Sequence, residues 1–166
     1  MGESTMSQEE TKQNFDIERK KHIDFFLPFY QEKNWIVNQD NINSNSPMSW
    51  DVRLEIFAGE FKLVDEKVVQ SEWNNCLVEI IQDIKTKNWG WLLGEKDWIL
   101  YSTWADIEAD SPSGLYLIKS KELKDHVLSL RGIIKMAISQ KGWGHSWNVI
   151  FEWDDLIRLK IADKII

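Results

Sequence analysis

The feature that most constrains the fold is a pair of strand-like runs joined by a two-residue turn. The runs are residues 50–57 (WDVRLEIF) and 60–68 (EFKLVDEKV), and Ala58 with Gly59 forms the turn between them. Asp51 begins the first run, and an acid–acid–lysine triplet lies near the end of the second run. Because the turn lies roughly midway between Asp51 and Asp65, a hairpin brings these two carboxylates close to each other.

Side chains of a strand alternate between its two faces, so Asp65 and Lys67 should share one face while Glu66 points to the other. Two converging carboxylates repel each other unless a cation or a proton lies between them. Such hard oxygen ligands suit Mg²⁺ or Mn²⁺. A neighbouring lysine can position a water molecule or stabilise charge that develops on phosphorus. Asp51, Asp65 and Lys67 therefore predict a site for metal-assisted phosphodiester hydrolysis.

The plain alternative is a surface hairpin with a cross-strand salt bridge, worth less than about 1 kcal/mol. Val64 and Val68 flank the triplet within a run that should be mostly buried, and the burial of charges without a role is costly. This context favours the functional interpretation of the three side chains.

The rest of the chain predicts an α/β protein. Apolar residues at helical spacing and short apolar runs indicate elements on both sides of the hairpin. The expected helices are residues 15–32, 71–87 and 121–140, with a short closing helix capped by Asp154. The expected strands are residues 34–39, 97–104, 115–120 and 147–153. Hairpins and crossovers in this order predict a three-layer fold, with a mixed central sheet flanked by helices. We expect residues 15–166 to form one domain and residues 1–14 a disordered tail.

Composition narrows the possible classes of protein. A single cysteine, Cys76, excludes an intramolecular disulfide and a cysteine-based zinc site, and the three histidines have no metal-ligand spacing. The net charge of −7 argues against a protein that coats nucleic acid electrostatically. No stretch approaches 18 continuous apolar residues, so we expect a cytoplasmic protein that does not span a membrane.

The order of helix, strand, hairpin, helix and strand, with thirteen residues between Asp51 and the triplet Asp65-Glu66-Lys67, resembles the PD-(D/E)XK nuclease superfamily. The likeness covers residues 15–123 and is strongest to small phage and bacterial members, restriction-endonuclease-like or resolvase-like. Trp50 stands where the motif has its proline. The resemblance implies a restriction-endonuclease-like fold, metal ligation by Asp51 and Asp65 with the main-chain carbonyl of Glu66, and a water positioned by Lys67.

Further acids could complete such a site. The resemblance implies an acid from the first helix, for which Glu18 is the candidate, and a Glu or Gln from the second helix, for which Glu79 and Gln82 are the candidates. Each of the three has an alternative interpretation as an exposed polar residue. The Glu66 side chain would replace Asp65 as the ligand if a bulge shifted the strand by one residue.

We therefore expect a Mg²⁺- or Mn²⁺-dependent nuclease that hydrolyses phosphodiester bonds of DNA rather than RNA. A homodimer is an option that the resemblance implies, because many nucleases of this type work in pairs to cut both strands. The alternative is a catalytically weak or inactive protein of the same fold that binds a protein or nucleic-acid partner. The acidic composition, the ten tryptophans and the lack of a clear basic groove favour that alternative. A hydrolase of another phosphate ester would share the site but not the substrate.

Overall fold

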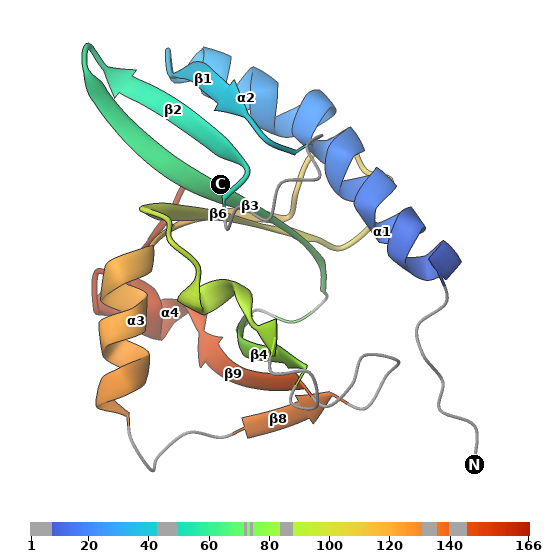
Figure 1. Cartoon of the computed structure of the whole chain (residues 1–166), viewed down its shortest axis with the longest axis vertical. Coiled ribbons are helices and arrows are strands. Elements are labelled where there is room, and N and C mark those ends of the chain that lie inside the picture. The colour runs from blue at the N-terminus through green and yellow to red at the C-terminus, as the bar shows by residue number, and fades with distance from the viewer. Residues whose placement is uncertain are drawn as a thin grey trace.

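The protein is built around a mixed six-stranded sheet, and a smaller four-stranded sheet lies beside it (Figure 1). The computed structural model describes residues 8–42, 50–71, 73, 75–83, 88–130, 136–139 and 146–166. The large sheet has the strand order β1-β2-β3-β6-β7-β10, and the small sheet has the order β5-β4-β9-β8. The expected mixed α/β architecture with a mixed central sheet is therefore confirmed.

The strands of the large sheet are β1 (Ile36–Asp40), β2 (Val52–Phe57), β3 (Glu60–Gln70), β6 (Trp98–Trp104), β7 (Gly114–Lys119) and β10 (Ala162–Lys164). The strands of the small sheet are β4 (Asn75–Asp83), β5 (Asn88–Trp89), β8 (Met136–Ser139) and β9 (Ser146–Glu152). The α-helices are α1 (Gln8–Lys21), α2 (Leu27–Glu32), α3 (Ser120–Ser129) and α4 (Trp153–Arg158). Two short turns of other helix types are η1 (His22–Phe26), which is π-helical, and η2 (Trp91–Leu93), which is 3₁₀-helical. Within the described ranges, no helix is long and apolar enough to cross a membrane.

The hairpin expected from the sequence is formed by β2 and β3. Gly59 has a φ of +81° in the turn, a left-handed conformation that glycine adopts without steric cost. Val52 pairs with Val64 and Arg53 with Leu63, so Asp51 lies opposite Asp65. The predicted proximity of the two acids is therefore confirmed. The turn alone would place Asp51 opposite Glu66, but the pairing shifts by one residue at Ile56 of β2.

The segment that follows the hairpin has a different secondary structure from the one predicted. Residues 71–87 were expected to form a helix, but residues 75–83 form strand β4, with Cys76 and Val78 buried and Leu77 exposed. This alternation has the period of a strand, and β4 pairs with β9. Together with β5 and η2, β4 forms the crossover that the parallel pairing of β3 with β6 requires.

The first helix also differs from expectation. Helix α1 begins at Gln8 rather than at residue 15, because Gln, Glu and Lys in residues 8–13 are good helix formers. Pro28 lies within the predicted helix, where a proline is expected to kink or end it. Instead, the chain passes through the π-helical turn η1, where the Leu27 N–H donates to the His22 carbonyl, and then continues as α2. A proline lacks the N–H and crowds the preceding turn, which this wider turn accommodates.

In the C-terminal half, two elements differ from their predicted bounds. The helix expected over residues 121–140 ends at Ser129, and residues 136–139 form strand β8 instead. The closing helix α4 begins at Trp153, and its N-cap residue is Glu152 rather than Asp154.

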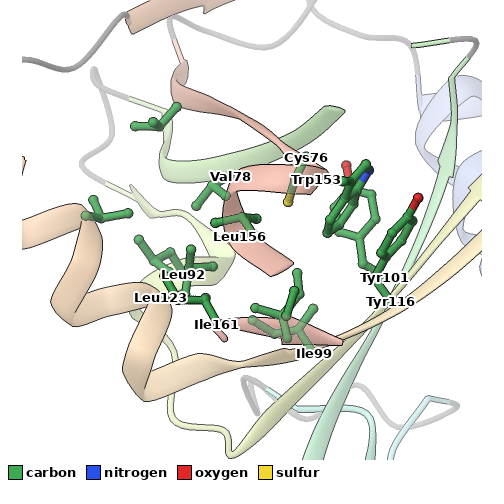
Figure 2. Packing of buried hydrophobic residues seen from close by; sticks show 14 residues of the cluster. Cys76, Val78, Leu92, Ile99, Tyr101, Tyr116, Leu123, Trp153, Leu156 and Ile161 are labelled. Atoms are coloured by element: carbon green, nitrogen blue, oxygen red, sulfur yellow. The ribbon is translucent and has the colours of Figure 1, made fainter. Parts of the chain in front are cut away.

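Two hydrophobic cores lie on opposite faces of the large sheet. One lies between the sheet and the η1–α2 segment and includes Phe26, Tyr30 and Leu100. The other lies between the sheet and the segment formed by β4, β9, α3 and α4, and Figure 2 shows its packing around Tyr101 and Trp153. Neighbouring side chains of β6 point to alternate faces of the sheet, so this strand contributes side chains to both cores. The large sheet is the central layer, with α1 on one side and the small sheet on the other (Figure 1).

The two-core arrangement predicts a large effect of truncation in the central strand β6. The Leu100→Ala variant should lower the free energy of unfolding by about 2–5 kcal/mol, because the Leu100 side chain is fully buried. The matched control Leu128→Ala removes the same atoms from a side chain that is 59% exposed on α3, and should change stability by less than about 0.5 kcal/mol. Urea unfolding monitored by tryptophan fluorescence measures both, and equal effects would contradict this account of the core.

Candidate active site

Asp51 and Asp65 form the centre of the candidate active site, at the end of the hairpin away from its turn. The Glu66 backbone N–H donates a 2.7 Å hydrogen bond to Asp51 Oδ2, which orients that carboxylate. Burial raises the pKa of Asp51 to about 8, and the negative charge of Asp65 adds to the shift. Two carboxylates therefore converge in a poorly solvated place, as the sequence predicted.

Asp65 lies between two lysines. Its Oδ1 is 2.9 Å from Lys67 Nζ, and its Oδ2 is 2.5 Å from Lys96 Nζ. Burial alone would raise the pKa of Asp65, but the two ammonium groups outweigh this effect and hold the pKa below its usual value. Asp65 is consequently a carboxylate that stays ionised although only 6% of its side chain is exposed. Asp65 and Lys67 share one face of β3, which confirms the expected alternation.

Lys96 is a residue that the sequence analysis missed. Its side chain is 1% exposed, and its ammonium also donates to the Trp91 carbonyl at 2.6 Å. Burial lowers the pKa of Lys96, with a further contribution from the charge of Lys67 that Asp65 opposes. In the sequence, Lys96 is recognisable only as a lysine two residues before the apolar run of β6. Its proximity to Asp65 follows only once β6 is known to pair with β3 in parallel.

Lys67 remains protonated at this site. Burial disfavours its charge, but Asp65, Asp51 and Glu18 together raise the pKa of Lys67 above its ordinary value. A group that holds its proton this firmly can donate hydrogen bonds and neutralise negative charge, but it cannot serve as a general base near neutral pH.

Two of the three supporting residues lie near Lys67. Burial raises the pKa of Glu18 and that of Glu79, and in both cases the charge of Lys67 opposes the shift. Glu18 lies on α1 as an exposed residue, as its alternative interpretation has it, and it also interacts electrostatically with Lys67. Glu79 lies on strand β4, not on a helix, and Gly90 allows the chain to pack closely against its carbonyl. Gln82 also lies in β4, but its side chain is outside the described part of the structure.

The Glu66 side chain points to the opposite face of β3. Pairing of β3 with β6 runs from Val64 to Gln70 without a shift, so the bulge that would bring this side chain to Asp51 is absent from that segment. The Tyr30 hydroxyl donates to Glu66 Oε1 at 2.6 Å, and His22 Nδ1 lies 2.8 Å from Glu66 Oε2. The idea that Glu66 replaces Asp65 is therefore wrong for this conformation.

His22 joins two carboxylates behind the site. Its Nε2 lies 3.0 Å from Asp40 Oδ2, while its Nδ1 contacts Glu66. Burial disfavours the charged ring, but Glu66 and Asp40 outweigh it and raise the pKa of His22. This buried contact ties η1 to β3 directly behind Asp65 and Lys67. No spacing pattern in the sequence predicts this contact, because the partners are 18 and 44 positions away.

The donor set of the site suits one hard cation. Asp51 and Asp65 supply carboxylate oxygens, and a cation would relieve the repulsion that raises the pKa of Asp51. Within the described residues, no group of three or more His, Cys, Asp or Glu side chains is arranged to hold a metal ion. A metal bound here would thus complete its coordination with main-chain, water or substrate oxygens, as Mg²⁺ commonly does.

No family model, no curated protein and no solved structure matches this chain.

The raised pKa of Asp51 predicts that this residue destabilises the metal-free protein. An acid whose pKa is higher in the folded state than in the unfolded state costs stability as soon as the unfolded chain ionises. The Asp51→Asn variant should therefore melt at a higher temperature in EDTA, and the gain should grow as the pH rises from 3.8 to about 8. Asp24→Asn, which replaces an exposed carboxylate on η1, is the matched control. Thermal melts across this pH range measure the effect, and a gain that does not depend on pH would refute the explanation.

Proposed function

We propose that this protein is a divalent-metal-dependent nuclease of the PD-(D/E)XK type that hydrolyses DNA phosphodiester bonds. The observation that carries the proposal is the cluster of Asp51, Asp65 and Lys67 at one end of the β2–β3 hairpin. The parallel pairing of β3 with β6 and the placement of α1 across the sheet are consistent with a restriction-endonuclease-like fold. Strands β4 and β5 stand where that type of fold was expected to have its second helix.

Asp51 and Asp65 would hold the metal, joined by the main-chain carbonyl of Glu66. When bound, a divalent cation would neutralise the negative charge on the substrate phosphate. The Glu66 N–H keeps Asp51 oriented toward Asp65. Lys67, charged and next to Asp65, donates hydrogen bonds to the attacking water or to an oxygen on which charge develops. Its firmly held proton makes it a positioning and charge-stabilising group for the reaction rather than a base.

One observation favours a second candidate, an interaction protein of the same fold with little or no catalysis. Both oxygens of Asp65 contact lysine ammonium groups, so the protein itself already supplies positive charge at this carboxylate. If Lys96 permanently takes the role of the cation, the cluster is a structural ion network. Binding to a protein or nucleic-acid partner would then be the function.

The first experiment is a calorimetric titration of Mn²⁺ into the purified protein, together with a cleavage assay on single-stranded and duplex DNA. The parent should bind Mn²⁺ saturably and cleave DNA, and EDTA should abolish cleavage. Asp51→Ala should lose the bound metal, whereas Lys67→Met should keep the metal but lose cleavage by a factor of about 100 or more. Asp24→Ala, an exposed carboxylate replaced by the same residue, should behave like the parent. Cleavage that survives Asp51→Ala would exclude this mechanism.

Replacement of Lys96 distinguishes the nuclease from the interaction protein. If the site binds a metal next to this ammonium, the Lys96→Met variant should bind Mn²⁺ about tenfold more tightly, because a repelling charge has been removed. If Lys96 is the resident cation of a structural network, the parent should bind no Mn²⁺ and the variant should acquire binding. Lys62→Met, at the other end of β3, should change neither result. The same calorimetric titration measures all three proteins.

A further inference from the structure

A cleft of about 440 Å³ lies between α1 and the C-terminal part of β3. Its walls are formed by Asn14, Phe15 and Glu18 of α1, by Val68 and Gln70 of β3, and by Ile107. A volume of this size is within the range that small-molecule sites occupy. The cleft is therefore large enough to take a base with its sugar.

The lining combines an aromatic surface with polar groups. The Phe15 ring is 44% exposed, and the Arg19 guanidinium carbon lies 5.7 Å from the ring centroid. An exposed aromatic face binds bases by stacking, and an arginine beside it adds a cation–π contribution and attracts a phosphate. Asn14 and Gln70 each bring an amide with both a hydrogen-bond donor and an acceptor.

The cleft lies next to the candidate active site. Val69, which also lines the cleft, lies two residues beyond Lys67 on the same face of β3, a distance of roughly 7 Å along a strand. Glu18 lines the cleft and also interacts electrostatically with Lys67 and Asp65. A strand of nucleic acid whose phosphate lies at Lys67 would thus carry a neighbouring nucleotide into this cleft.

We propose that the cleft binds an unstacked base of single-stranded DNA next to the phosphodiester bond that is cut. This inference rests on the proposed nuclease function and deepens it, because it assigns the substrate class. A base within a duplex is stacked on both sides and does not present a face to Phe15. The site consequently prefers single strands, frayed ends or flaps over continuous duplex.

The test compares the Phe15→Ala variant with the parent in binding to a fluorescein-labelled single-stranded oligothymidylate. Fluorescence anisotropy is recorded in EDTA and again in Ca²⁺. Phe57→Ala is the matched control, since Phe57 is 71% exposed and lies at the turn of the hairpin, at the far end from Asp51. Gln70→Ala is a second cleft variant. A duplex of the same length shows whether single strands are preferred.

The parent should bind the single strand more tightly than the duplex. Phe15→Ala should weaken single-strand binding by at least about fivefold, and Gln70→Ala should weaken it less, while Phe57→Ala should not change it. Unchanged binding by Phe15→Ala, or equal affinity of the parent for duplex, would overturn the cleft proposal while metal binding and cleavage at Asp51 stand. Failure of the parent to bind the oligonucleotide in either buffer also overturns it, and the Mn²⁺ titration then decides the proposed function separately.

Discussion

The ionic contacts of Asp65 with two lysines are the interaction on which the site depends. A carboxylate that is 6% exposed can remain charged only if positive charge lies close to it, and that charge comes from Lys67 on β3 and from Lys96, two residues before β6. The parallel pairing of these strands sets the distance between the lysines. Burial and the negative charge of Asp65 raise the pKa of the neighbouring Asp51 to about 8, and the charge of Lys67 offsets only part of this shift.

The two faces of β3 make different contacts. Asp65 and Lys67 point toward the face covered by β4 and η2, whereas Glu66 points toward η1 and contacts Tyr30 and His22. The second set of contacts holds the helical segment at a defined place against the strand. Helix α1 leads directly into η1. The attachment of η1 to β3 therefore also determines the position of α1, which brings Glu18 near Lys67 and forms one wall of the cleft beside Phe15.

The sequence was a good guide to the hairpin and a poor one to the segment after it. The apolar residues of 71–87 fit a helical period, yet β-branched and alternating residues in the same run also fit a strand, and periodicity does not distinguish these cases over a short run. What decided the outcome is pairing of Val78 with Val149, a contact between segments far apart in the chain. For the same reason, Glu79 reaches the neighbourhood of Lys67 from a strand although a helix was expected to bring it there.

By itself, the sequence determined the hairpin and the face on which Asp65 and Lys67 lie. Both follow from local rules: a two-residue turn with Gly59 joins the strands, and the period of two along a strand defines the faces. The pairing of Asp51 with Asp65 depends in addition on the extra residue Ile56 in β2, which shifts the register by one residue. Only the tertiary structure decided that Lys96 is the second cation and that His22 anchors Glu66. These partners are brought together by the parallel β3–β6 pairing and by the packing of η1, and such long-range contacts leave no spacing pattern in the chain.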